Sequence, residues 1–69
     1  MSDEINATRA MDIANQAMQK AGWTYKLITG VRKENTHWIV TVFTLGGGYY
    51  IVKINASTGE IVELSTVKR

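Results

Sequence analysis

The chain has 69 residues, a formal net charge of +2 and no cysteine. This length allows one domain with one small core, and a chain without cysteine forms no disulfide and no thiolate metal site. The single histidine argues against a zinc site, and no apolar run approaches the roughly 18 residues that span a membrane. The eight Lys and Arg residues are scattered along the chain rather than gathered in runs, which argues against a nucleic-acid partner.

The start of the chain, Met1-Ser2-Asp3-Glu4, is acidic, and no apolar segment follows it. We therefore expect no secretory signal in this chain. The compartment stays open: the protein is cytoplasmic, or it is a domain cut from a longer envelope or secreted protein.

A helix is predicted over about residues 6–21. Apolar residues recur there at helical spacing, from Ala7 to Ala21, and polar residues fill the opposite side. Asn6 suits the N-cap and Gly22 suits the residue after the helix. The stripe is mostly alanine, which favours close packing of the helix on a sheet; a partner-binding groove is the alternative.

After Gly22 the period changes to two, which predicts strands at about 23–33, 37–45, 49–54 and 60–65. Gly30 is expected to mark a bulge or bend in the first of them. We therefore predict a single α+β domain over residues 1–69, with one N-terminal helix packed on a four-stranded antiparallel meander (α-β-β-β-β).

The turns predict the register of the strands. A three-residue glycine loop, Gly46-Gly47-Gly48, pairs Leu45 with Tyr49 and Phe43 with Ile51. A type I turn with Gly59 in the left-handed region produces a bulge that pairs Ile54 with Val62 and Val52 with Leu64. The face expected under the helix is rich in valine, and its residues are Trp38, Val40, Val42, Tyr50, Val52, Ile54, Val62 and Leu64.

The other face of the sheet is predicted to be uncovered, since one helix covers one side only. Its apolar members form the expected interaction surface: Ile39, Phe43, Leu45, Tyr49, Ile51 and Ile61. An exposed apolar patch on a small protein marks an interaction site. The alternative is that β-propensity alone selected these residues.

The residues that catalysis requires are not grouped in this sequence. His37 lies at a strand start and reads as a solvated loop histidine, and the carboxylates are spread over the termini, helix surface and turns. We therefore expect no catalytic residue, no cofactor and no metal, and a protein that is not an enzyme.

The chain resembles the PepSY family over about residues 6–64. The resemblance lies in the helix end Lys20-Ala21-Gly22, in the strand Trp38–Val42, and in the hairpin Asn55-Ala56-Ser57-Thr58-Gly59-Glu60, where Asn55 stands for the family's usual Asp. PepSY domains accompany secreted peptidases as propeptide or inhibitory segments and occur in cell-envelope proteins. The helix-on-sheet plan is also similar to that of cystatins, but Ile28-Thr29-Gly30-Val31 does not match their Gln-X-Val-X-Gly loop, so cysteine-protease inhibition is not supported.

The resemblance implies a non-catalytic module that binds a protein or regulates a peptidase. The partner is expected to be another protein or a second copy of the chain, as a homodimer through the uncovered face or a strand edge. The alternative is a small basic protein that binds single-stranded nucleic acid, with Tyr49 and Phe43 stacking on bases and Lys53 beside them.

Overall fold

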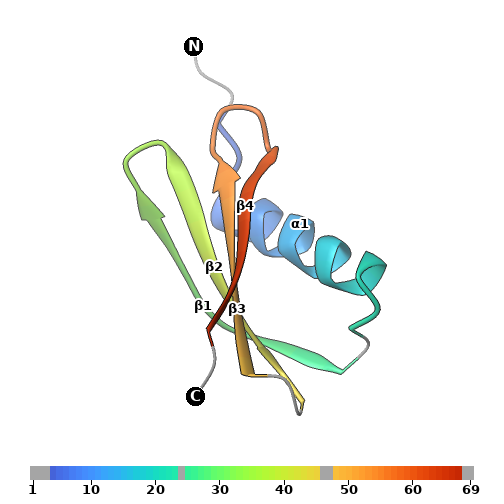
Figure 1. The fold of residues 1–69 in the computed structure, drawn as a ribbon. Coiled ribbons are helices and arrows are strands. Elements are labelled where there is room, and N and C mark those ends of the chain that lie inside the picture. Colours follow the sequence, from blue (N-terminus) through green and yellow to red (C-terminus); the bar gives the residue numbers. More distant parts are fainter. Residues whose placement is uncertain (1–3, 24, 46–47, 68–69) are drawn as a thin grey trace.

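The computed structural model describes residues 4–23, 25–45 and 48–67. It contains one helix, α1 (Ala7–Lys20), followed by four strands: β1 (Lys26–Glu34), β2 (His37–Thr44), β3 (Gly48–Asn55) and β4 (Ile61–Val67). The strands form one antiparallel sheet in the order β1-β2-β3-β4, and α1 lies on one side of it (Figure 1). The predicted α+β meander is confirmed.

Both ends of α1 are stabilised by the residues that the sequence indicates. The side chain of Asn6 accepts a hydrogen bond from the Arg9 backbone N–H at 2.8 Å. At the other end, Gly22 takes a φ of +99°. The N–H groups of Gly22 and Trp23 bond back to the Gln19 and Met18 carbonyls, each at 3.0 Å, which is a Schellman motif.

The core lies between α1 and the near face of the sheet. Its fully buried members come from every fourth residue of α1 and from alternate residues of β2 and β3: Ala10, Ala14, Met18, Val40, Val42, Val52 and Ile54. The small alanine side chains bring the helix close to the valine-rich surface, and Met18 fills the space that remains. The alanine stripe is therefore core rather than a groove.

Hydrogen bonds attach the segment before α1 to β2 and to the β3–β4 turn. The Ile5 N–H donates to the Ala56 carbonyl at 2.9 Å, and the Trp38 indole N–H donates to the Ile5 carbonyl at 3.0 Å. Ala56 in turn donates its N–H to Thr36 at 2.8 Å. The helix start is thereby held at one end of the sheet.

The β2–β3 hairpin differs from the prediction by two residues. Phe43 pairs with Tyr49 and Thr44 with Gly48, so the expected pairings of Leu45 with Tyr49 and Phe43 with Ile51 are wrong. Gly48 takes a φ of +85° where β3 begins, and the Leu45 N–H bonds to the Tyr25 carbonyl at 3.3 Å instead of joining the ladder. A slip of two residues keeps every side chain on its predicted face. Gly46 and Gly47 lie outside the described residues.

The bulge of the β3–β4 hairpin lies at Val62, inside β4, rather than at Gly59 as predicted. Ile61, not Val62, pairs with Ile54, and the register then shifts so that Glu63 pairs with Lys53 and Leu64 with Val52. Gly59 has the expected left-handed conformation, with a φ of +79°. Val62 and Leu64 are 54% and 46% exposed, so the prediction that they are core residues is wrong. The reason is that α1 makes most of its backbone contacts with β1 and β2 and leaves β4 largely uncovered.

A second bulge bends β1. The register shifts between Ile28 and Gly30, which leaves Thr29 as the extra residue. This agrees with the bulge or bend predicted at Gly30, and Figure 1 shows the bend. The strand begins at Lys26 rather than at Trp23, whose ring packs on the core at 5.5 Å from that of Tyr50.

Candidate protein-binding surface

The face of the sheet away from α1, called the back face below, is not covered by any element of the described residues. Cross-strand pairs arrange its side chains in rows, because directly opposed residues project to the same side. From the β2–β3 loop outward the rows are Leu27, Phe43, Tyr49 and Val67; then Gly30, Thr41, Ile51 and Ser65; then Arg32, Ile39, Lys53 and Glu63; and finally Glu34, His37 and Asn55.

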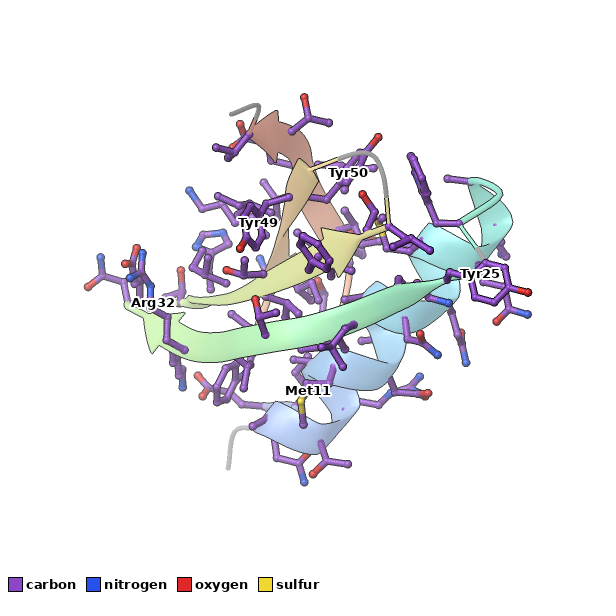
Figure 2. The ribbon with its side chains drawn as sticks, turned by 90° about the horizontal axis from the view of Figure 1, so that it is seen from below. Met11, Tyr25, Arg32, Tyr49 and Tyr50 are labelled. Atoms are coloured by element: carbon purple, nitrogen blue, oxygen red, sulfur yellow. The ribbon has the colours of Figure 1, made fainter. Side chains whose placement is uncertain are left out.

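The rows change from apolar to charged along the strands. Figure 2 shows Tyr25 and Arg32 at opposite ends of β1, and it shows Tyr49 and Tyr50 on opposite sides of β3. Tyr50 faces the core side with Trp23, whereas Tyr49 belongs to the back face. Because successive residues of a strand project to opposite sides, Tyr50 packs on the core and Tyr49 lies on the back face.

The apolar end of the back face is an open surface rather than part of the core. We call it the apolar patch, and it consists of Tyr25, Leu27, Phe43, Leu45, Tyr49 and Val67. The Phe43 and Tyr49 rings contact each other with centroids 5.3 Å apart and planes tilted by 58°. Leu27 and Leu45 are 63% and 70% exposed, and together with Phe43 and Tyr25 they line a shallow hollow of about 360 Å³.

The charged end of the back face mixes both signs. The Arg32 guanidinium forms an ion pair with Glu34 at 2.8 Å, and the Glu63 carboxylate accepts a hydrogen bond from the Ser65 hydroxyl at 2.9 Å. Lys53 lies directly opposite Glu63 in the ladder. A second hollow, of about 270 Å³, is lined by Arg32, Lys53, Glu63 and Ser65 together with Ile39 and Ile51. A partner that covers the whole face would have to match an apolar region at one end and alternating charges at the other.

The structure places five of the six predicted surface residues on this side. Ile39, Phe43, Tyr49 and Ile51 lie on the back face by register, and Leu45 borders it in the turn after β2. Ile61 does not. It pairs with the buried Ile54 and lines a hollow with Ile13 and Ala17 of α1, so it lies on the helix side. The bulge is the cause: the extra residue follows Ile61 instead of preceding it, which reverses the side to which Ile61 projects.

Sequence reasoning does not assign Tyr25, Leu27 and Val67 to this surface. The face of Leu27 could not be predicted from the sequence, because the extra residue Thr29 reverses the alternation between the two halves of β1. Val67 could have been found, because the period of two continues from Glu63 through Ser65 to Val67.

The described residues contain little that resembles a catalytic or metal centre. His37 is half-buried at the start of β2, with its Nδ1 at 3.1 Å from the Thr36 hydroxyl. No group of three or more His, Cys, Asp and Glu side chains that could hold a metal ion occurs in residues 4–23, 25–45 and 48–67. In the same part of the chain, no helix has the length and apolar character that a membrane crossing requires.

Comparison with known families identifies the domain. The sequence model of one family, described as the peptidase propeptide and YPEB domain, or PepSY, matches residues 4–64. The chain belongs to the PepSY family. No curated protein and no solved structure matches it.

The PepSY match covers nearly all of the described elements, from the segment before α1 to the middle of β4. The resemblance seen in the sequence is confirmed. The family is a peptidase propeptide and regulatory domain. The hairpin that carries the family motif is well formed: the Asn55 side chain accepts hydrogen bonds from the Ser57 and Thr58 N–H groups at 2.8 and 3.2 Å. Asn55 thus accepts the hydrogen bonds that stabilise the turn, as the family's usual Asp would, but carries no charge.

Proposed function

We propose that this PepSY domain is a non-catalytic protein-binding module that regulates a peptidase, and that the apolar patch on its back face contacts the partner. The observation that supports this is the exposure of five aromatic and aliphatic side chains around the half-buried Tyr49, on a side of the sheet that α1 does not cover. Exposed apolar area of this kind loses its contact with water when a partner binds, which favours association.

The chemistry of the patch suits a protein partner. Phe43 and Tyr49 offer large, rigid side chains, and aromatic residues of this type dominate the energetics of protein interfaces. The charged end, with Arg32, Lys53 and Glu63, supplies polar groups at the border, which restrict the orientation of a partner. A peptidase surface with an apolar centre and both signs of charge near it would be complementary.

The test is a titration of the purified domain into the peptidase that is encoded nearest to it in its genome, with hydrolysis of a fluorogenic peptide as the readout. We expect the hydrolysis rate to change saturably with domain concentration. Phe43→Lys should weaken the effect at least tenfold, because it places a charge in the centre of the patch. The matched control is Asn15→Lys, which adds the same charge to the exposed side of α1. If the domain has no effect, or if both variants behave like the original, the proposal fails.

A second copy of this chain is the other partner that the apolar patch could bind. In that case the mass measured by light scattering rises with concentration, and Phe43→Lys or Ile51→Lys lowers it. A concentration-dependent mass that neither change affects would show that the patch is not the contact between copies.

Binding of single-stranded nucleic acid is the less favoured function. The basic side chains of the back face are Arg32 and Lys53, and each lies beside a carboxylate, Glu34 and Glu63 respectively. Such neighbours reduce the attraction for phosphates. Salt-sensitive binding to a single-stranded oligonucleotide that is lost on Tyr49→Ala and Lys53→Ala would favour this function over the proposed one.

A further inference from the structure

The two edge strands of the sheet differ in how they are protected from pairing with another strand. β1 carries four charged residues, Lys26, Arg32, Lys33 and Glu34, and is bent by the bulge at Thr29. Charges and bulges are the usual means by which edge strands avoid unwanted pairing. β1 is therefore a poor edge for adding a further strand.

β4 has almost none of these protections. Its seven residues include one charge, Glu63, and no lysine, arginine or proline. Four of its apolar side chains are 41–54% exposed: Ile61, Val62, Leu64 and Val67. After the bulge at its start, the strand pairs regularly with β3 from Glu63 to Val67. An exposed, regular and apolar edge of this kind is suited to pairing with another strand.

The direction of the free backbone groups follows from the β3–β4 turn. Asn55 uses both of its backbone groups toward β4: its N–H donates to Glu60 and its carbonyl accepts from Gly59, each at 2.8 Å. Backbone direction alternates along a strand, so Lys53, Ile51 and Tyr49 also face β4, and their partners Glu63, Ser65 and Val67 face β3. The N–H and C=O groups of Leu64 and Thr66 therefore point to the outer edge, where no strand of the described residues pairs with them.

We propose that β4 pairs antiparallel with β4 of a second copy of this chain, with Leu64 on the two-fold axis. Leu64 then exchanges its backbone hydrogen bonds with Leu64 of the second copy, and Thr66 lies opposite Val62. This register uses the outward-pointing groups of Leu64 on both sides and extends over the regular part of β4, from Glu63 to Val67. It also places Glu63 opposite Ser65 of the second copy, with which a carboxylate can form a hydrogen bond.

The neighbouring registers are less favourable. Centring the pair on Glu63 opposes two carboxylates directly, which is destabilising. Centring it on Ser65 shortens the overlap and leaves Ile61 beyond the paired region. Glu63, the single charged residue of β4, thus disfavours the register centred on itself. One charge is also too few to prevent the edge from pairing.

The pairing joins two sheets edge to edge and leaves the back face free. The two-fold axis is perpendicular to the sheet, so both α1 helices lie on the same side, and the apolar patches stay exposed on the other. The Leu64 side chains, which α1 leaves uncovered, meet across the axis. The edge pairing is centred on Leu64, whereas the partner contact of the back face is centred on Phe43 and Tyr49, so either proposal can fail while the other stands.

Cross-linking tests the register directly, because the chain has no cysteine of its own. In a hydrogen-bonded antiparallel pair the Cα atoms are about 5.5 Å apart, within the range that a disulfide bridges. Leu64→Cys should therefore give a covalent dimer under mild oxidation, at a protein concentration where the control Asn15→Cys stays monomeric. Asn15 is also exposed but lies on α1, away from both proposed contacts. No dimer with Leu64→Cys, or more dimer with Glu63→Cys, would overturn the proposed register.

Sedimentation equilibrium tests the contact without a cross-link. We expect a reversible dimer whose dissociation constant rises at least tenfold on Leu64→Lys, which opposes two charges on the axis, and changes less than twofold on Asn15→Lys, which adds the same charge to the exposed side of α1. Circular dichroism establishes that each variant is folded. A monomer at all concentrations overturns the proposal. So does a dimer that Phe43→Lys dissociates and Leu64→Lys does not, because such a dimer would use the back face.

Discussion

Two isoleucines on the same strand give a sharp test of which face of the sheet is core. Ile54 is fully buried under α1, whereas Ile51 is half-buried on the back face. Ile54→Ala removes packed methyl groups and leaves a cavity, which costs about 3 kcal/mol. Ile51→Ala removes the same groups from a surface that is already in contact with water, which costs about 1 kcal/mol.

These values are large compared with the total stability. A chain of 69 residues is expected to have roughly 3–10 kcal/mol of unfolding free energy. For a domain of this size, each kcal/mol lowers the thermal midpoint by about 4–8 °C. We therefore expect a loss on the order of 15 °C for Ile54→Ala and about 5 °C for Ile51→Ala.

The measurement is urea-induced unfolding followed by the fluorescence of Trp23 and Trp38, with all variants at one protein concentration because dimerisation would add to the apparent stability. If Ile51→Ala costs as much as Ile54→Ala, the back face is buried in the isolated protein, and the description of an open binding surface is wrong. Repeating the comparison at a tenfold lower concentration distinguishes burial against a second copy from burial within one chain.

The remaining predictions concern the ends of α1, the attachment of its first residue and the motif hairpin. Asn6→Ala removes the acceptor at the helix start and should cost about 1 kcal/mol in thermal unfolding, whereas Asn6→Asp should not. Gly22→Ala places a Cβ at a φ of +99° and should cost about 1 kcal/mol, although no atom lies within 4 Å of the added carbon; an unchanged midpoint would contradict the helix end described above. Trp38→Phe loses the indole hydrogen bond to Ile5 and should cost about 1 kcal/mol, with earlier hydrogen exchange in the segment before α1. Asn55→Ala should destabilise the turn by about 1 kcal/mol, whereas Asn55→Asp, which restores the family's residue, should be close to neutral in a chemical unfolding curve.

Local signals were sufficient for the elements that depend on neighbouring residues. The helix α1 is predicted to within a residue at each end. The helical spacing of its alanines, the Asn6 cap and Gly22 are sufficient for this, because caps and spacing act within one or two turns. The motif hairpin is equally local, since the Asn55 side chain bonds to N–H groups two and three residues later. The order of strands and the face of nearly every residue in β2 and β3 follow from the period of two.

Long-range contacts decided the rest. The N–H of Leu45 bonds to Tyr25, which lies 20 positions earlier, and this contact accompanies the two-residue slip of the β2–β3 hairpin. Nothing in the residues around the loop indicates that bond.

The surface available for binding shows the same division. The sequence by itself determined that one face of the sheet is uncovered and that Phe43, Tyr49 and Ile51 lie on it, because a single helix covers one side and the alternation of residues assigns these three to the other. Only the tertiary structure decided that Ile61 turns to the helix side and that β4 stays exposed beside α1, because the first depends on the position of one extra residue and the second on where the helix rests across the strands.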